Sequence, residues 1–185
     1  RDLGLNADTT LLINSLGCPA CRPAYLARLT TFLKSVSADI CDECRDRIER
    51  NPLRCLDCKR EGCSAQYASA PKIGETLCEA CNIHDRKLKE FLSDAGIAFV
   101  VQDRLVRGLD YYVRTVFEFV STALGAQDAL IAGGRYDGLV KSLGGPEIPA
   151  VGFAGGIERA IELMMKQNAP ADSGVAPGGS IFLVC

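Results

Sequence analysis

Four pairs of cysteines, each with two residues between its members, constrain the fold of this chain more than any other feature. The pairs are Cys18/Cys21, Cys41/Cys44, Cys55/Cys58 and Cys78/Cys81, and Cys63 follows Cys58 by five positions. Two thiolates at this spacing can bind one zinc ion, and two such pairs complete a closed tetrahedral site. Because nine of the ten cysteines lie between residues 18 and 81, this stretch is expected to form a metal-stabilised module.

The spacing favours a nested arrangement of two zinc sites. An inner site would surround the turn at Asn51-Pro52, and an outer site would join the two ends of the module. The inner ligands would be Cys41, Cys44, Cys58 and Cys63, the outer ligands Cys18, Cys21, Cys78 and Cys81, and Cys55 and Cys185 would be spare. An interleaved pairing stays open, as do replacement of one ligand by His84 and a role of some cysteines as buried apolar residues.

Composition indicates a folded protein of the cytosol. The chain of 185 residues is 48% hydrophobic and 24% charged, which suffices for a buried core. No stretch approaches the roughly 20 apolar residues that span a membrane, and the start at Arg1-Asp2 has no secretory pattern. A cytosolic chain keeps its thiols reduced, which disfavours disulfides. Since the chain starts without Met and ends in an apolar run at Cys185, we expect an internal piece of a longer protein.

The net charge of −2 does not indicate nucleic-acid binding, but one local segment is basic. Residues 45–60 carry six cations, which are candidate RNA contacts: Arg45, Arg47, Arg50, Arg54, Lys59 and Arg60. Three acidic residues in the same segment leave a charge of +3, which could meet RNA phosphates. Charge alone favours the alternative of a solvated helical face with pairs such as Asp46 and Arg50.

Periodicity predicts an α+β chain. Helices are expected at residues 22–37, 42–50, 75–95 and 155–166, and strands at 10–16, 97–101, 115–122 and 129–132. In the third helix Leu77, Leu88, Phe91 and Leu92 should face inward and Gly96 should cap the end, whereas Ile157, Ile161, Leu163 and Met164 of the last are available for burial. The expected division is 1–17, the start of a catalytic sheet; 18–95, the cysteine-rich insertion; 96–168, the rest of the catalytic domain; 169–179, a linker; and 180–185, the first strand of a further domain.

Three blocks carry a resemblance to a known family. Residues 105–118 read LVRGLDYYVRTVFE, residues 132–140 read AGGRYDGLV, and residues 151–159 read VGFAGGIER. They resemble the two signature motifs of histidyl-tRNA synthetases and motif 3 of class II synthetases. INSLGCPACRPAY and NPLRCLDCK resemble the insertion of bacterial members, so the resemblance covers nearly the whole chain. It implies part of a class II antiparallel β-sheet with flanking helices, plus a small, mostly helical zinc insertion.

The resemblance also implies roles for individual residues. Arg107 would be the catalytic arginine that bridges the histidine carboxylate and the α-phosphate of ATP. Tyr111, Tyr112 and Tyr136 would line the histidine pocket, with the rings of Tyr111 and Tyr112 on opposite faces of a strand. Gly133 and Gly134 would let the backbone approach the ligand closely, and Arg159 would hold the γ-phosphate. Taken alone, Arg107 would more simply form a salt bridge with Asp110 or Glu118, and Arg159 with Glu158 or Glu162.

Parts of the family pattern are not visible in this chain. Motifs 1 and 2 would precede residue 1, and the anticodon-binding domain would follow about residue 178. The expected parent is a homodimer that uses ATP with Mg²⁺ to activate histidine and loads it onto tRNA(His), whereas this chain alone should not complete adenylation. Two alternatives stay open: a synthetase-like regulatory paralogue of histidine biosynthesis, and a zinc-dependent RNA-binding module.

Overall fold

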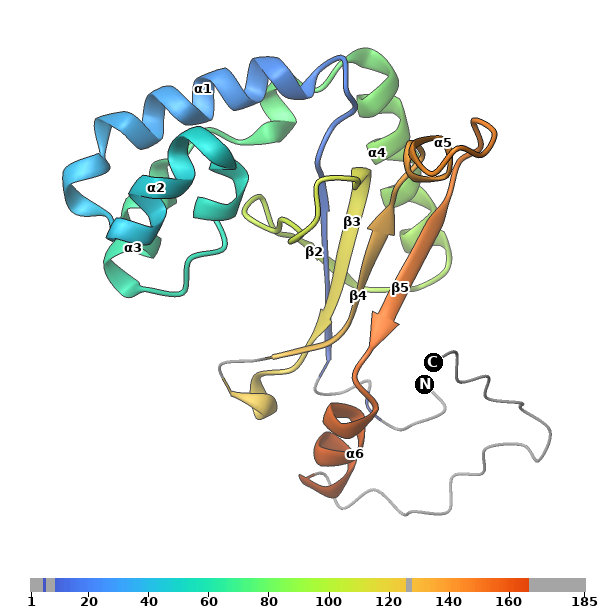
Figure 1. Cartoon of the computed structure of the whole chain (residues 1–185). Helices are drawn as coiled ribbons and strands as arrows, with labels where there is room; N and C mark the ends of the chain where they lie inside the picture. The colour runs from blue at the N-terminus through green and yellow to red at the C-terminus, as the bar shows by residue number, and fades with distance from the viewer. Residues whose placement is uncertain (1–4, 6–8, 126–127, 167–185) are drawn as a thin grey trace, which may run out of the picture.

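A five-stranded sheet forms the centre of the computed structural model, which describes residues 5, 9–125 and 128–166. The strand order is β2-β1-β3-β4-β5, and all five strands run through the middle of Figure 1. Their bounds are β1 (Thr10–Ser15), β2 (Phe99–Val101), β3 (Val113–Val120), β4 (Ala129–Arg135) and β5 (Val151–Gly155). The mixture of one sheet with helices agrees with the predicted α+β class.

One strand pair departs from the predicted antiparallel sheet. β1 and β2 are parallel, with Leu12 opposite Val100, whereas the other three pairs are antiparallel. Parallel neighbours need a long crossover connection, and residues 16–98, which include the cysteine-rich stretch, provide it. The stretch predicted to be an insertion, residues 18–95, thus lies within the connection between two adjacent strands of the sheet.

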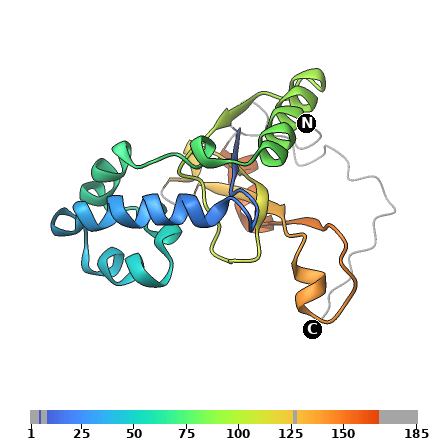
Figure 2. The same cartoon turned by 90° about the horizontal axis from the view of Figure 1, so that it is seen from above.

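Four helices lie within this crossover. They are α1 (Arg22–Ser35), α2 (Asp42–Arg50), α3 (Glu61–Gln66) and α4 (Glu79–Asp94), with short 3-10 turns between them. Figures 1 and 2 show α1, α2 and α3 grouped on one side, while α4 lies separately beside the sheet. Helix α4 is fixed to β3 by a hydrogen bond of 2.9 Å between His84 Nε2 and Thr115 Oγ1.

Helix α1 forms for the reasons the sequence predicts, although it ends at Ser35 and not at Ser37. A proline occupies its first turn, where no backbone donor is lost. Tyr25, Leu29 and Leu33 recur every four residues and are at most 1% exposed. This stripe is the centre of a core that also contains five buried residues of α2, α3 and the turns around them, namely Cys44, Ile48, Cys55, Cys63 and Tyr67.

Helix α4 differs from its prediction at the start and agrees at the end. Residues 73–76 form a separate 3-10 turn and Leu77 is extended, so the helix begins only at Glu79, not at Glu75. Gly96 caps it with φ +63°, and the Ile97 amide donates to Leu92 O at 2.8 Å, as in a Schellman ending. The predicted burial of Phe91 is wrong, because this side chain is 70% exposed.

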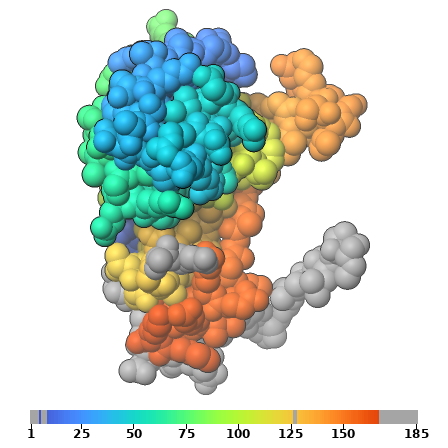
Figure 3. Space-filling model, turned by 60° about the vertical axis from the view of Figure 1, so that its left-hand side comes forward, coloured from blue at the N-terminus to red at the C-terminus, as the bar shows by residue number. Residues whose placement is uncertain are grey.

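The C-terminal elements surround a second, smaller core. Helix α5 (Leu139–Ser142) projects beyond the sheet, and α6 (Ile157–Lys166) follows β5; Figure 3 shows α6 at the end of the molecule opposite the insertion. Leu163 is fully buried against Leu130. Ile157 and Ile161 are 67% and 46% exposed, so their expected burial is not observed.

The predicted linker 169–179 and strand 180–185 lie outside the described residues. Among the helices that are described, none is long and apolar enough to cross a membrane.

The core of α1 should dominate the stability of the insertion. Leu29→Ala removes a fully buried side chain, and we expect the free energy of unfolding to fall by about 3 kcal/mol. The same change at Leu143, which is 80% exposed, should alter it by less than about 0.5 kcal/mol. Urea denaturation followed by circular dichroism measures both values, and equal losses would contradict this assignment of the core.

Candidate functional site

Eight cysteine sulfurs converge into two groups of four. In each group the sulfur atoms all lie within 4.8 Å of one another. The outer cluster contains Cys18, Cys21, Cys78 and Cys81, and the inner cluster contains Cys41, Cys44, Cys58 and Cys63. The structure thus brings together the ligand sets of the nested arrangement, and not those of an interleaved one.

The sulfur separations fit a tetrahedral metal site. A zinc–sulfur bond of about 2.3 Å in tetrahedral geometry places neighbouring sulfurs about 3.8 Å apart. In the outer cluster the Cys18 sulfur lies 3.7 Å from the sulfurs of both Cys21 and Cys78. In the inner cluster the sulfurs of Cys41 and Cys58 are 4.0 Å apart. All these distances far exceed the roughly 2.05 Å of a disulfide bond.

Each cluster starts where a helix starts, and backbone amides there favour thiolates. Burial opposes ionisation of Cys18, but hydrogen bonds from the amides of Cys21 and Ala20 and from the thiols of Cys21 and Cys81 together lower its pKa to about 6. The amide of Cys44 lowers the pKa of Cys41 to about 7. Burial and neighbouring thiols raise the pKa values of Cys44 and Cys81. Four thiolates at this spacing would repel one another unless a cation lay between them, and a soft divalent ion such as Zn²⁺ fits an all-sulfur donor set.

Two other candidate ligands lie outside the clusters. His84 belongs to neither group and is hydrogen-bonded to Thr115. Cys55 is fully buried, and its thiol donates to the Cys44 carbonyl at 3.4 Å. Cys55 thus behaves as a small apolar core residue, and Cys185 lies outside the described residues.

Arg107 lies in the irregular segment before β3 and forms an ion pair with Glu118 on that strand. Both side chains are largely buried, with 23% and 19% of their surfaces exposed. Burial raises the pKa of Glu118, and the charge of Arg107 opposes that rise. The Nε atom of Arg107 is buried without a hydrogen-bond partner in the described structure. The guanidinium thus retains an unused donor that an anion could accept.

Three tyrosine rings gather beside this arginine. The ring centroids of Tyr111 and Tyr112 are 4.7 Å apart, and Tyr136 lies within 5.9 Å of both. The guanidinium carbon of Arg107 is 6.0 Å from the centre of the Tyr112 ring. The prediction that Tyr111 and Tyr112 point to opposite faces of a strand is wrong, because β3 begins only at Val113 and both residues precede it.

The glycines between β4 and its neighbours make room for protein atoms. A Cβ at Gly133 would lie 2.7 Å from Phe153 Cβ on β5, and one at Gly134 would lie 2.8 Å from the Tyr112 ring. A Cβ at Gly152 would collide with the Tyr136 hydroxyl. Gly152 was not predicted from the sequence as a site residue, although it lies in the VGFAGGIER block. Because of these contacts, the three glycines allow the strands and the tyrosines to pack closely.

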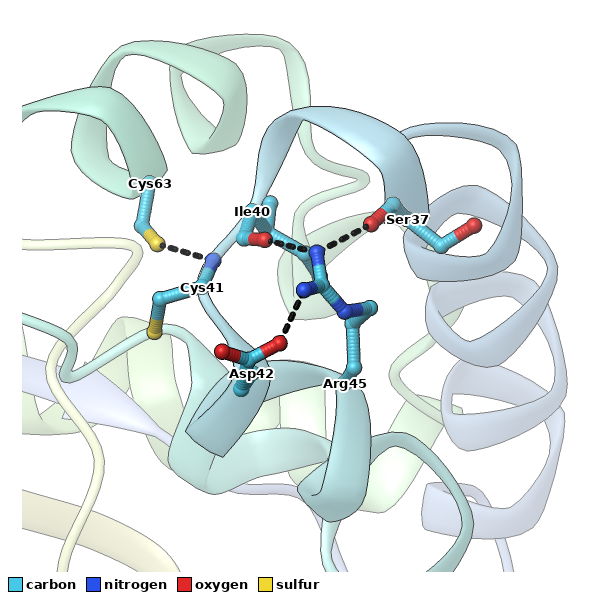
Figure 4. A network of polar contacts seen from close by, with 6 residues as sticks. All are labelled: Ser37, Ile40, Cys41, Asp42, Arg45 and Cys63. Atoms are coloured by element: carbon cyan, nitrogen blue, oxygen red, sulfur yellow. Dashed lines mark hydrogen bonds and ion pairs between the residues drawn. The ribbon is translucent and has the colours of Figure 1, made fainter.

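Arg159 and part of the basic segment have partners in the protein. Arg159 Nη1 donates to the Ala129 carbonyl at 2.7 Å, at the opposite end of β4 from Tyr136. Arg45 and Arg47 pair with Asp42 and Glu43, whereas no ion pair joins Asp46 to Arg50 among the described residues. Figure 4 shows Arg45 also reaching the carbonyls of Ser37 and Ile40, beside the hydrogen bond of 3.2 Å from the Cys41 amide to Cys63 Sγ.

Comparison with known proteins assigns the chain. A model of the histidyl-tRNA synthetase family matches residues 61–160, more than half of the sequence. The chain belongs to the histidyl-tRNA synthetase family. Within the family it is 52% identical to the histidine–tRNA ligase of Desulfosudis oleivorans over 170 residues, and 50% identical to that of Geobacter sulfurreducens over 167 residues. These alignments cover 92% and 90% of this chain, but 40% of each relative.

A solved structure of the family shares the fold. The crystal structure of apo S. aureus histidyl-tRNA synthetase superposes with a TM-score of 0.68 at 32% sequence identity. The superposition covers 92% of this chain and 41% of the S. aureus chain. The sheet and helices described above therefore correspond to part of the family's structure.

The contact between β4 and β5 should tolerate no side chain at Gly133. Gly133→Ala places a methyl group against the backbone of β5, and we expect a loss of about 2 kcal/mol or more in the free energy of unfolding. Gly138→Ala is the matched control, because nothing lies within 4 Å of its added carbon, and it should change stability by less than about 1 kcal/mol. Urea denaturation of both variants measures these changes. A Gly133→Ala variant as stable as the wild type would refute the close contact between β4 and β5.

Proposed function

We propose that this chain forms part of a histidine–tRNA ligase that activates histidine with ATP and transfers it to tRNA(His). The observation that carries the proposal is the position of Arg107, whose buried and unsatisfied Nε lies beside three clustered tyrosines. The names of the relatives from D. oleivorans and G. sulfurreducens support the ligase over the regulatory paralogue and over a stand-alone RNA-binding module. A cytoplasmic homodimer is part of the same proposal.

In this reaction Arg107 would act on the step that forms the adenylate. A carboxylate and a phosphate, both anionic, must approach while further negative charge develops on the α-phosphate. A guanidinium is always charged and offers two parallel donors, so it can bind both groups at once. The ion pair with Glu118 holds Arg107 in place before substrates bind.

The tyrosines would form the histidine pocket. Phenol hydroxyls of Tyr111, Tyr112 and Tyr136 can pair with the imidazole nitrogens, and analogues without those nitrogens would leave polar groups unpaired. Gly133 and Gly134 contribute by allowing Tyr112 and the neighbouring strands to pack closely at this site.

For ATP we propose Arg107 at the α-phosphate and Arg159 at the γ-phosphate. Ala132 lies opposite Glu118, the partner of Arg107, and Arg159 contacts Ala129 three positions earlier in β4. Three residues of a strand span about 10 Å, a separation suited to the two ends of a triphosphate. Among the described residues only cysteines form groups of three or more potential metal ligands.

We further propose that residues 18–95 form an insertion domain that holds two Zn²⁺ ions, one in each cysteine cluster. Sulfur spacing and the all-thiol donor set support this. For tRNA(His), Arg50 and Arg60 remain the best candidates of the basic segment, because their side chains are exposed and make no ion pair or hydrogen bond within the described part of the chain.

Arg107→Ala in a full-length ligase that carries this segment should lower kcat for histidine-dependent pyrophosphate exchange by about 10²–10³-fold. The KM for histidine should change much less, because the charge acts mainly in the transition state. Arg107→Lys keeps a charge but loses the paired donors, so its kcat should be intermediate. A normal kcat with only a raised KM would refute the catalytic role.

The purified 185-residue chain should contain two zinc ions, measured by elemental analysis after refolding with excess zinc and desalting. Cys81→Ser should reduce the content to one ion, since three remaining thiolates bind a tetrahedral ion less tightly. Cys55→Ser is the control, and it should retain both ions because Cys55 lies outside the clusters. A wild-type content of zero would reject the metal assignment.

A further inference from the structure

The inner cysteine cluster lies next to the segment that carries Arg107. Its sulfurs come from the start of α2, from the turn that follows Cys55, and from α3. Between Cys44 and Cys58 the chain runs through the end of α2 and a 3-10 turn, and this stretch faces residues 104–110, here named the Arg107 segment. Figure 3 shows the cyan surface of this stretch in contact with the yellow-green surface of the Arg107 segment.

Hydrogen bonds join both ends of the Arg107 segment to residues that lie next to the inner cluster. Asn51 Nδ2 donates to Asp110 Oδ1 at 2.9 Å. At the other end, Arg104 Nη1 donates to both the carbonyl and the hydroxyl of Ser64 at 3.1 Å. Ser64 directly follows the inner ligand Cys63. The Arg107 segment is thus attached to residues whose positions depend on the inner cluster.

The middle of the Arg107 segment is covered from the same side. Arg54 lies so close to Gly108 that a Cβ there would be 2.5 Å from its Nη1 atom. Leu105 and Val106 are buried in the same core as Cys55 and Leu56. These contacts come from the cluster side, and the ion pair with Glu118 comes from the sheet side.

The Arg107 segment has no regular structure of its own. It contains neither helix nor strand, and Leu109 at its tip is 54% exposed. In such a segment the placement of Arg107 depends on side-chain contacts and not on a backbone ladder. A shift of about 1 Å in a catalytic group can cost about 10²-fold in rate.

We propose that the metal centre of Cys41, Cys44, Cys58 and Cys63 fixes the Arg107 segment for catalysis, with Asn51 and Arg54 as its positioning residues. Loading of the inner centre thereby controls the geometry of Arg107 across the boundary between insertion and sheet. This inference rests on the proposed function for its kinetic consequence, but its structural part stands independently.

The structural part is tested on the zinc-loaded 185-residue chain by ¹⁵N relaxation. We expect order parameters near about 0.85 for the amides of Gly108 and Leu109, falling below about 0.6 in the double variant Asn51→Ala/Arg54→Ala. Zinc content should stay at two ions in the double variant, because no ligand is removed. Asp46→Ala, at an exposed position of the same helix α2, is the matched control. Its order parameters for Gly108 and Leu109 should equal those of the wild type. Removal of zinc by a chelator should reproduce the mobility of the double variant.

Either of two results overturns the structural part: a rigid Arg107 segment in the zinc-loaded double variant, or an inner cluster that takes up no metal. The double variant keeps the test decisive even if chelation unfolds the insertion.

The kinetic part is tested in a full-length ligase that carries this segment. Asn51→Ala/Arg54→Ala should lower kcat for pyrophosphate exchange about tenfold, with KM values for histidine and ATP within about twofold of the wild type. Asp46→Ala should leave kcat unchanged. An unchanged kcat in the double variant overturns the inference. Absence of exchange in the wild type would instead reject the proposed function, whereas the relaxation measurements would still decide whether the centre fixes the segment.

Discussion

The convergence of four sulfur atoms in two places is the constraint on which the rest of the insertion depends. Helices α2 and α3 are short, and isolated helices of nine and six residues are not stable in water. Their packing places four cysteines of the inner cluster among the buried side chains of α1, while the outer cluster joins the end of β1 to the start of α4. The cysteine clusters thus supply cross-links to a small core, where a larger protein would use more aliphatic side chains.

The same contacts explain how a helical insertion can matter to a site built on a sheet. Arg22 follows the outer ligand Cys21 and donates to the carbonyls of Leu16 and Tyr112. Asn51 reaches Asp110 from the inner side. The segment from Arg107 to Tyr112 is therefore contacted by two parts of the insertion. A comparison of motifs alone would treat insertion and catalytic blocks as separate.

Local patterns predicted the elements whose determinants are local. The proline and the four-residue apolar spacing gave α1, and Gly96 gave the end of α4. The late start of α4 was missed because Leu77 is held extended beside the outer cluster, which is a tertiary effect.

The predicted placement of Tyr111 and Tyr112 on a strand was wrong for a similar reason. β3 has a register shift near its start and Arg114 adopts φ +54°, which alternation along a strand does not predict. The sequence of α6 shows an apolar stripe, but a stripe does not indicate which element packs against it. Ile157 and Ile161, which were available for burial, are therefore exposed in the structure. Spacing favoured the two groups of cysteines that the structure brings together but left an interleaved arrangement open. The pairing of Arg107 with Glu118 was likewise one of two options that only the fold could separate.

The parallel pairing of β1 with β2 also determines the order in which the molecule can assemble. β1 pairs with residues 99–101 and 115–120, all of which follow residues 18–95 in sequence, whereas β3, β4 and β5 pair with neighbours along the chain. Closing so long a loop has an entropic cost that is met before β1 can pair with either neighbour. Joining Cys18 and Cys21 to Cys78 and Cys81 through a metal ion would shorten the path from β1 to β2 to the short stretch from Ser15 to Cys18 and the helical stretch from Cys81 to Phe99. Metal uptake would then act on the folding rate of the sheet, in addition to the stability of the insertion.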